Sequence, residues 1–352
     1  MEKRGGLKIA CTYTAVILGA GFASGQEILK YFVGYGISGA IGLALAGVLF
    51  ALAGWAVLDI CHREKIHDYG TLMHHLLGNG LGRAAEMVVA AFLCVLFATM
   101  IAAAGATAKQ GFNLPFTAGV VAAAALCFAV LLFDLDGVIR LNAILAPFMV
   151  VGGVTVGVFT FLNGTVTTFS QVSPVIPGWA LAAVVYASYN LVTGIPVLTA
   201  SSKLSRGKRQ NMLGGVLGGA ALTLLGLCLA LPLYLHYKEV ISAEIPLLLV
   251  VGGYGNIFTG LYLTVLICAI FTTAASSAFA FIDWFCARIH INRKVLAAVI
   301  CVFGIVGAHV GFSNMVSYAY PVFGLLGLFE ITVILLSWRK APVAGKKAVE
   351  PC

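Results

Sequence analysis

The chain has 352 residues, of which 61% are hydrophobic and only 10% charged, and its mean hydropathy is +1.02. Soluble domains carry about 25% charged residues, so we expect lipid to be the solvent for much of this surface. The net charge of +8 then indicates basic cytoplasmic loops rather than a nucleic-acid partner. Backbone groups find no water in hydrocarbon, and the long apolar runs lack the alternation of a β-barrel. The composition therefore predicts an all-α polytopic membrane protein.

Ten apolar stretches are each long enough, at roughly 20 residues, to cross a bilayer as a helix. The first follows a short basic head, Met1–Lys8, and is too long for a cleavable signal peptide, so we expect it to remain as the first span. The stretches lie near residues 8–30, 37–60, 84–108, 116–134, 139–162, 178–200, 211–235, 256–285, 294–311 and 315–338.

Lys and Arg residues are unevenly distributed over the loops between these stretches. With the N-terminus in the cytoplasm, 18 of the 21 fall on the cytoplasmic side, and only Lys30, Lys109 and Lys238 fall outside. An error of one span would scramble this asymmetry. The sequence therefore predicts a multi-pass protein of the plasma (inner) membrane with both termini cytoplasmic. It forms one transmembrane domain over 1–352, with a cytoplasmic tail at 339–352.

Two stretches outside the spans carry recognisable patterns. Asp68–Leu77, in the second loop, predicts a short surface helix capped by Asp68. Ala243–Val251 is apolar but too short to span, which indicates a re-entrant or lid segment. The second loop also holds four histidines, which we interpret as solvated, with metal binding or pH sensing as the alternative: His62, His67, His74 and His75. The nine scattered cysteines form no C-x-x-C pair, and we interpret them as small reduced residues.

The first span contains three glycines near mid-membrane, Gly19, Gly21 and Gly25. Each weakens a helix by about 1 kcal/mol relative to Ala, so three within seven residues favour a break. The alternative is close helix packing through the G-x-x-x-G spacing. Ser24, Gln26 and Glu27 favour the break, because a packing face does not need polar side chains.

The sixth span shows a parallel pattern, since polar side chains lie near its middle and Gly194 and Pro196 follow. Proline interrupts the helical hydrogen-bond ladder. Spans one and six begin two halves of five spans each, 8–162 and 178–338, and an odd number of spans per half inverts the second half. Interrupted helices at matching positions of inverted halves indicate a transporter site. The polar residues of the sixth span are Tyr186, Ser188, Tyr189 and Asn190.

Hydroxyls and carboxylates in other spans add to this pattern. The eighth span has four hydroxyls in six residues, Thr272, Thr273, Ser276 and Ser277, which are either cation ligands or bonded to their own helix. Glu330 lies within the tenth span, where it is either functional or bonded to a neighbouring helix. Glu27 either has a functional role or forms a surface pair with Lys30.

The ten spans, the Gly19-Ala20-Gly21-Phe22 stretch and the hydroxyls from Thr273 to Ser277 resemble the LeuT-fold transporters, which include the amino acid–polyamine–organocation superfamily. Gly19–Glu27 looks most like the YkvI-type family of bacterial permeases. The resemblance implies a LeuT-like 5+5 inverted repeat with broken helices 1 and 6. It implies ion-coupled symport of a small solute, an amino acid or related amine, by alternating access. It implies neither enzymatic activity nor a cofactor other than the coupling ion, Na⁺ or H⁺.

The resemblance also implies roles for individual residues. Na⁺ would be held by the carbonyls of Ala15 and Leu18, with Gly19 and Phe22 as the alternative register, and by the oxygens of Thr273, Ser276 and Ser277. Glu27 and Glu330 would act in gating or coupling. The substrate would meet Gly19, Ala20, Gly21, Phe22, Ala23, Ser24, Tyr186, Ser188, Tyr189, Asn190 and Phe97, with Thr99 and Met100 beside Phe97.

This chain departs from the related transporters at two points. Phe22 stands where many amino-acid permeases have Ile, and Gln26-Glu27 stands near the Arg of sodium-coupled neurotransmitter carriers. The acid indicates a cationic or amine-bearing group nearby, or a proton.

Two other functional classes remain as alternatives. One is a passive channel or a structural membrane protein. The other is an intramembrane serine protease, for which Ser24-Gly25 and His309 give a faint match. Phe22 replaces the glycine which that match requires, and the spacing from His309 to Gly311 is one residue short.

Overall fold

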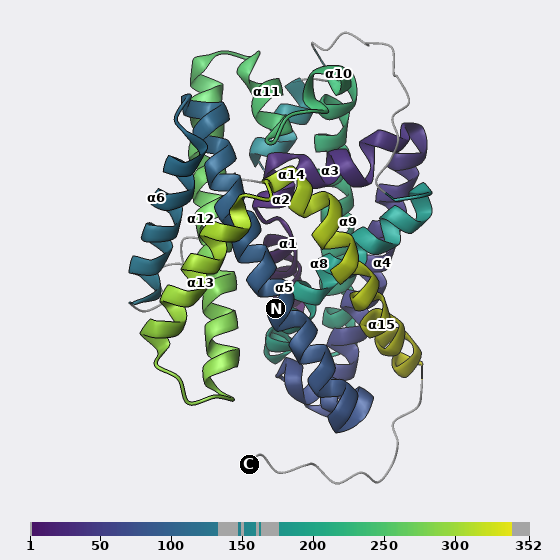
Figure 1. Ribbon diagram of the computed structural model, residues 1–352. Coiled ribbons are helices and arrows are strands. Elements are labelled where there is room, and N and C mark those ends of the chain that lie inside the picture. The colour runs from purple at the N-terminus through teal and green to yellow at the C-terminus, as the bar shows by residue number, and fades with distance from the viewer. Residues whose placement is uncertain (1, 133–146, 149–150, 160–161, 163–175, 340–352) are drawn as a thin grey trace.

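The computed structural model of the protein describes residues 2–132, 147–148, 151–159, 162 and 176–339 (Figure 1). The described residues form helices joined by turns and contain no strand, which confirms the all-α class. Within the described residues, six helices are long and apolar enough to cross a membrane: α4 (Ile37–Glu64), α5 (Tyr69–Phe112), α8 (Trp179–Ser201, continued to Leu204), α9 (Lys208–Leu235), α12 (Asn256–Cys286) and α15 (Tyr320–Trp338, preceded without a gap by short turns from Phe312).

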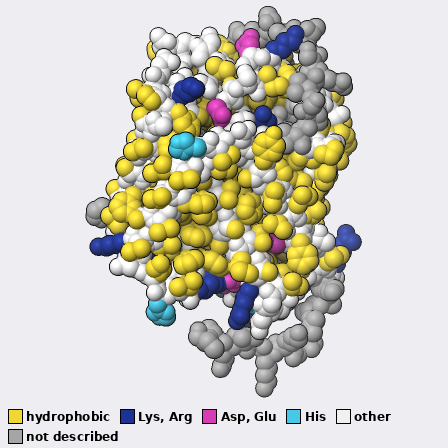
Figure 2. Space-filling view, in the orientation of Figure 1, with side chains coloured by type: hydrophobic (Ala, Val, Ile, Leu, Met, Phe, Trp, Pro, Cys, Tyr) yellow, Lys and Arg dark blue, Asp and Glu magenta, His cyan; other side chains and the backbone are white. Residues whose placement is uncertain are grey.

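Shorter helices complete the bundle: α1 (Glu2–Ile17), α6 (Phe116–Leu131) and α13 (Arg293–Ala308). The fifth predicted span, 139–162, falls mostly outside the described residues, so the count of ten spans stays a prediction. Apolar side chains cover the middle band of the face in Figure 2, whereas most charged side chains lie toward the two ends. Large apolar residues such as Leu224 (61% exposed) and Val306 (67% exposed) belong to this outer surface, which suits contact with lipid tails.

The helix of the first predicted span stops and restarts. α1 ends at Ile17, Leu18 and Gly19 are not helical, and α2 (Ala20–Ser24) follows. Gly25 then takes a left-handed conformation with φ +80°, after which α3 (Gln26–Tyr31) begins. A Cβ at residue 25 would lie 2.7 Å from Leu247 Cγ, so both the backbone angle and the packing require glycine. The two turns let α3 run across the bundle (Figure 1).

The sixth predicted span differs, because α8 is one uninterrupted helix from Trp179 to Ser201 with Pro196 inside it. The predicted break in the sixth span is therefore wrong for this structure. Polar side chains bond to backbone carbonyls of the same helix on both sides of the proline: Asn190 donates to the Tyr186 carbonyl at 3.0 Å and Thr199 to that of Ile195 at 2.7 Å. Gly194 lies within the continuous helix, and a Cβ there would make an ordinary contact with the ring of Tyr13 at 3.4 Å.

The second loop folds as predicted into a short surface helix. Asp68 caps the start of α5 by accepting a hydrogen bond from the Thr71 amide at 2.8 Å. Gly78 interrupts α5 with φ +76°, and the long span follows it. The predicted surface helix at Asp68–Leu77 and its cap are therefore confirmed.

The helices pack in a crossed arrangement around α1. α1 lies against α8 and α9, α4 lies against α8 and α9, and α5 contacts α6, α12 and α13. α15 packs on α8, and α12 on α6. α4 and α9 approach closely through small residues, since a Cβ on Gly219 would lie 2.6 Å from the Ala51 nitrogen. Such close backbone approach is typical of helix packing in membranes.

Short elements connect the long helices: η1 (Val33–Tyr35), α10 (Tyr237–Val240), α11 (Pro246–Gly252), α14 (Phe312–Asn314) and the π-turn η3 (Met315–Ala319). A further short element, η2 (Ser202–Leu204), extends α8. The predicted re-entrant or lid segment falls on α11, where Leu247 and Leu248 are buried. Gln110 at the end of α5 bonds to the carbonyl and the amide of Ile245, at 2.8 and 3.1 Å. The segment is thus a short helix tied to the end of α5.

Candidate functional site

The interruption after α1 brings unpaired backbone groups together inside the bundle. The last carbonyls of α1, including that of Ala15, and the first amides of α2 have no partner in their own helix, and the carbonyl of Leu18 lies in the interruption between them. α12 packs on α2 at this point. The hydroxyl oxygen of Thr273 on α12 lies 3.6 Å from where a Cβ of Gly19 would stand. The structure thus places a hard oxygen donor beside the interruption.

The other hydroxyls of α12 are engaged differently. Thr272 donates to the Ala269 carbonyl at 3.2 Å, and Ser277 donates to the Ala274 carbonyl at 3.0 Å. A hydroxyl that donates still has oxygen lone pairs available. Ser276 and Thr273 are half-buried. These oxygens suit a small cation in type, while the sodium-ligand role of Ala15, Leu18, Thr273, Ser276 and Ser277 stays a prediction.

Glu27 turns inward from α3 toward α2. Its side chain is 6% exposed, and Oε1 fills the space over Gly21 that a Cβ would otherwise take. No ion pair joins it to Lys30, so the predicted surface pair is not seen in the described part of the chain. Tyr189 and Asn190 of α8 face the carboxylate, yet its Oε2 has no hydrogen bond of normal geometry within the described residues.

Four tyrosines surround this carboxylate, and all lie within electrostatic reach of it: Tyr31, Tyr186, Tyr189 and Tyr320. The ring centroid of Tyr31 lies 5.7 Å from that of Tyr186 and 5.4 Å from that of Tyr189. Tyr189 and Tyr320 are 5.0 Å apart, and Phe92 of α5 lies 5.5 Å from Tyr320. We call the four tyrosines the tyrosine cluster; they come from α3, α8 and α15.

Several buried polar atoms at this place lack a hydrogen-bond partner among the described residues. They are Glu27 Oε2, Tyr189 Oη and Tyr320 Oη, although Tyr189 faces Glu27 and Tyr320 faces Thr99. An unsatisfied buried polar group costs about 1–3 kcal/mol. Three of them beside one interrupted helix are therefore expensive for a site with only a structural role, and they are groups that a bound polar solute would satisfy.

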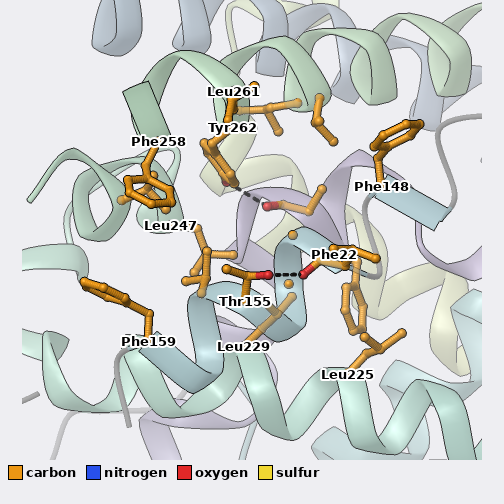
Figure 3. A pocket seen from close by; sticks show the side chains of 18 of the residues that line it. Phe22, Phe148, Thr155, Phe159, Leu225, Leu229, Leu247, Phe258, Leu261 and Tyr262 are labelled. Carbon is orange, nitrogen blue, oxygen red and sulfur yellow. Dashed lines mark hydrogen bonds between the residues drawn. The ribbon is translucent and has the colours of Figure 1, made fainter. Parts of the chain in front are cut away.

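Other predicted substrate residues lie on the opposite side of α2. Phe22 and Ala23, together with the predicted sodium ligand Leu18, line a largely apolar cavity of about 290 Å³ (Figure 3). Tyr262 of α12 reaches across it to donate a hydrogen bond to the Ala23 carbonyl at 2.7 Å, and Leu229 of α9 lines another wall. α2 thus separates a polar side, at Gly21 and Glu27, from an apolar side.

Two predicted residues serve local structure instead. Ser24 donates to the Gly21 carbonyl at 2.8 Å and accepts from the Gln26 amide at 3.2 Å, which supports the turn at Gly25. Because backbone groups engage this hydroxyl, the match to a serine nucleophile weakens. Asn190 bonds to its own helix while it faces Glu27.

The ring of Phe97 packs on α13, so its predicted place in the substrate site stays a prediction. A Cβ on Gly304 would meet Phe97 Cε1 at 2.5 Å. Phe92, one and a half turns earlier on α5, contacts the tyrosine cluster instead. Thr99 faces Tyr320 while bonding to the Val95 carbonyl at 2.8 Å, and Met100 is fully buried.

The sequence analysis did not assign Tyr31 or Tyr320 to the substrate site. Tyr31 could have been found, because it follows Glu27 by four residues and so shares its helix face. For Tyr320, the sequence shows only an aromatic residue near the start of the last span, which does not indicate a place in the substrate site. Phe92 carries no signal in the sequence, since nothing distinguishes it from other apolar residues of its span.

Glu330 lies apart from this site. It is 2% exposed and accepts a hydrogen bond from Tyr69 at 3.1 Å, while its Oε1 has no partner among the described residues. Glu330 follows Tyr320 by ten residues, which is about 15 Å along a helix. The structure therefore does not bring Glu330 together with Glu27.

The histidines of the second loop each contact different groups. His67 is 2.8 Å from the hydroxyl of Ser202, and His74 is 3.3 Å from the carboxylate of Glu86. Glu86 also pairs with Arg288 after α12. In the described part of the chain, no three His, Cys, Asp or Glu side chains converge as a metal site would require.

No family model matches the chain. Two curated proteins of Bacillus subtilis (strain 168) are similar over almost their whole length. The uncharacterized protein YyaD is 25% identical over 334 residues, covering 95% of this chain and 97% of that protein. The uncharacterized membrane protein YkvI is 24% identical over 336 residues, covering 95% and 96%.

Solved structures of transporters share the fold at low sequence identity. A Na⁺-coupled sialic acid symporter in a substrate-bound outward-open state has a TM-score of 0.60 and 13% identity, covering 93% of this chain and 80% of that one. Mhp1 in an inward-facing conformation has a TM-score of 0.61 and 14% identity, covering 93% and 75%. A manganese transporter of Eremococcus coleocola has a TM-score of 0.60 and 15% identity, covering 93% and 77%. The chain therefore has the LeuT fold, and the predicted resemblance to LeuT-fold transporters and to YkvI-type membrane proteins is confirmed.

Proposed function

We propose that this protein is a secondary active transporter, an ion-coupled symporter that moves a small solute, an amino acid or related amine, by alternating access. The observation that carries the proposal is the interruption at Leu18–Gly19, with unpaired buried polar atoms on one side of it. Irregular backbone at membrane depth is tolerated where it lines a site or is buried in protein. Helix ends facing each other there can hold a charged solute and a cation.

The comparisons support the general class. Two of the proteins with this fold are a Na⁺-coupled symporter and a manganese transporter by name. Because their sequence identity to this chain is low, we infer the solute and the coupling ion from this chain's own residues.

The packing supports a 5+5 inverted repeat, with halves at 8–162 and 178–338. If α1 corresponds to α8, α4 to α9, α5 to α12 and α6 to α13, then two of the contacts between these helices have counterparts. α1 packs on α9 as α8 packs on α4, and α5 packs on α13 as α12 packs on α6. The distribution of Lys and Arg supports an inner-membrane location with both termini cytoplasmic.

For the coupling ion we propose Na⁺, with H⁺ as the alternative. The carbonyls at the end of α1 and the hydroxyl of Thr273 offer uncharged hard oxygens at one place. Ser276 and Ser277 follow on the next turn of α12. Glu27 and Glu330 are the buried carboxylates proposed to act in gating or coupling.

Reconstitution into liposomes tests this function. Labelled amino acids and amines are screened for uptake driven by an inward Na⁺ or H⁺ gradient. We expect saturable uptake that a gradient accelerates; uptake that neither saturates nor responds to a gradient would instead support a passive channel. Na⁺ dependence that survives the double change Ser276→Ala plus Ser277→Ala would defeat the sodium-site assignment. Thr264→Ala is the matched control, because that hydroxyl lies on the exposed face of the same helix and bonds to Gly260.

A further inference from the structure

The site contains its own negative charge. Glu27 reaches back over Gly21, so the protein's carboxylate lies beside the first turn of α2. Lys30, one turn further along α3, interacts electrostatically with Glu244 instead. No Lys, Arg or His of the described chain forms an ion pair with Glu27. A buried carboxylate without a cation is costly, so this one either takes up a proton or pairs with a positively charged partner.

The surroundings of Glu27 suit an organic cation. Aromatic ring faces attract ammonium groups by about 0.5–1 kcal/mol each at exposed sites and by more when water is excluded. The tyrosine cluster offers four such rings, and the hydroxyl oxygens of Tyr189 and Tyr320 have no hydrogen bond of normal geometry among the described residues. A carboxylate and several aromatic rings at one place form a recognisable ammonium site.

The same arrangement disfavours a substrate carboxylate at this place. Two like charges a few ångströms apart repel strongly when water is excluded. A zwitterionic amino acid that paired its ammonium group with Glu27 would bring its own carboxylate close to that of Glu27, because the two groups of an amino acid share one carbon. A substrate without a carboxylate avoids this repulsion.

We propose that the solute is an organic ammonium compound that lacks a carboxylate, and that its cationic nitrogen pairs with Glu27 within the tyrosine cluster. This inference rests on the proposed transport function and narrows its substrate class to amines. Ring centroids only 5.0–5.7 Å apart are in contact, so a solute enters when the cluster opens. Because the rings belong to α3, α8 and α15, relative movement of these helices would open it.

The test uses pairs of compounds that differ by one carboxylate. The purified full-length protein in detergent is titrated with tyramine and tyrosine, isobutylamine and valine, ethanolamine and serine, and tetramethylammonium and trimethylglycine. Binding is read from the shift in melting temperature, because a ligand specific for the native state stabilises it. We expect at least one amine to bind at least tenfold more tightly than its carboxylated partner. Equal or tighter binding of the amino acids would overturn the inference.

Variants locate the binding. Glu27→Gln keeps the shape of the side chain and removes its charge, and it should weaken amine binding at least tenfold. Glu239→Gln is the control, because that carboxylate is 72% exposed and its one ion pair within the described residues is with His236. Tyr189→Phe keeps the ring and should change binding less than threefold, whereas Tyr189→Leu should weaken it about tenfold. Undiminished amine binding in Glu27→Gln or in Tyr189→Leu would contradict the inference. If one of these two variants misfolds, the other still gives the answer.

Uptake into liposomes separates this inference from the transport function on which it rests. Gradient-driven uptake of an amine but not of its amino-acid partner supports both. Gradient-driven uptake of amino acids but not of amines would support the transport function and overturn the ammonium site. Amine binding without any gradient-driven uptake overturns the transporter.

Discussion

The two spans that begin the halves of the chain carry the same sequence pattern and fold differently. Both combine glycine with polar side chains near mid-membrane, and the sixth adds Pro196. Yet the first is interrupted at Leu18–Gly19, and α8 continues through its proline. The difference lies in tertiary contacts. Gly25, at the turn after α2, needs a left-handed backbone against Leu247, while a Cβ at Gly194 would lie 3.4 Å from Tyr13. Gly19, at the interruption itself, has φ −63° and room for a Cβ 3.6 Å from Thr273, so the requirement for glycine lies at the turn after α2 and not at the break.

The largest expected effect is at Gly25. Gly25→Ala imposes a left-handed angle on an L-residue and overlaps Leu247, which together should cost about 2–4 kcal/mol. We expect the apparent melting temperature to fall by about 5–10 °C. Gly34→Ala is the matched control, because its Cβ would meet nothing closer than 3.9 Å. Equal melting temperatures for the two variants would show that the turn after α2 is not constrained in this way.

Thr273→Val tests whether the interruption acts together with α12. The change keeps the size of the side chain and removes the oxygen beside Gly19. If that oxygen binds the coupling ion, the Na⁺ concentration for half-maximal uptake should rise about tenfold, which corresponds to roughly 1.4 kcal/mol. Thr264→Val on the exposed face of α12 should leave it unchanged. An unaltered Na⁺ requirement in Thr273→Val would remove this residue from the ion site.

Tyr262→Phe tests the apolar side of α2. It removes the hydrogen bond to the Ala23 carbonyl and leaves that carbonyl without this donor. The expected cost is about 1–2 kcal/mol of stability, measured as a lower melting temperature. Tyr318→Phe changes a residue that is 71% exposed and should have no effect. No loss in Tyr262→Phe would mean that α2 is held in place without α12.

The smallest effect is expected in α8. Pro196→Ala restores a backbone N–H that can bond to the Val192 carbonyl, so the melting temperature should stay the same or rise slightly. The effect should be small because α8 is continuous even with proline at this position. A clear fall in melting temperature, or loss of uptake in a stable variant, would instead indicate that the proline shapes a functional bend.

Much of the fold could be predicted because bilayer thickness and hydropathy fix helix lengths, and capping chemistry fixed the surface helix that begins after Asp68. The side of a helix that a residue occupies was harder to predict. Phe22 and Gly21 are neighbours in sequence but face an apolar cavity and a carboxylate, respectively. Phe97 and Phe92 look alike in sequence, and only the packing of α5 on α13 decides which of them reaches the site.

The inward turn of Glu27 also depended on contacts beyond local sequence. Its spacing from Lys30 equally allowed a surface pair, which the fold replaces with burial over Gly21. The tyrosine cluster gathers side chains from residues 31 to 320, so no local pattern predicts it.

A structure of the protein bound to the amine that gives the largest thermal shift tests the account most directly, because α2 offers two distinct sides. The account predicts new density in contact with Glu27 and Gly21 and against the ring of Tyr189. Density confined to the apolar cavity between Phe22 and Tyr262, with Glu27 and the tyrosine cluster unchanged, would contradict it.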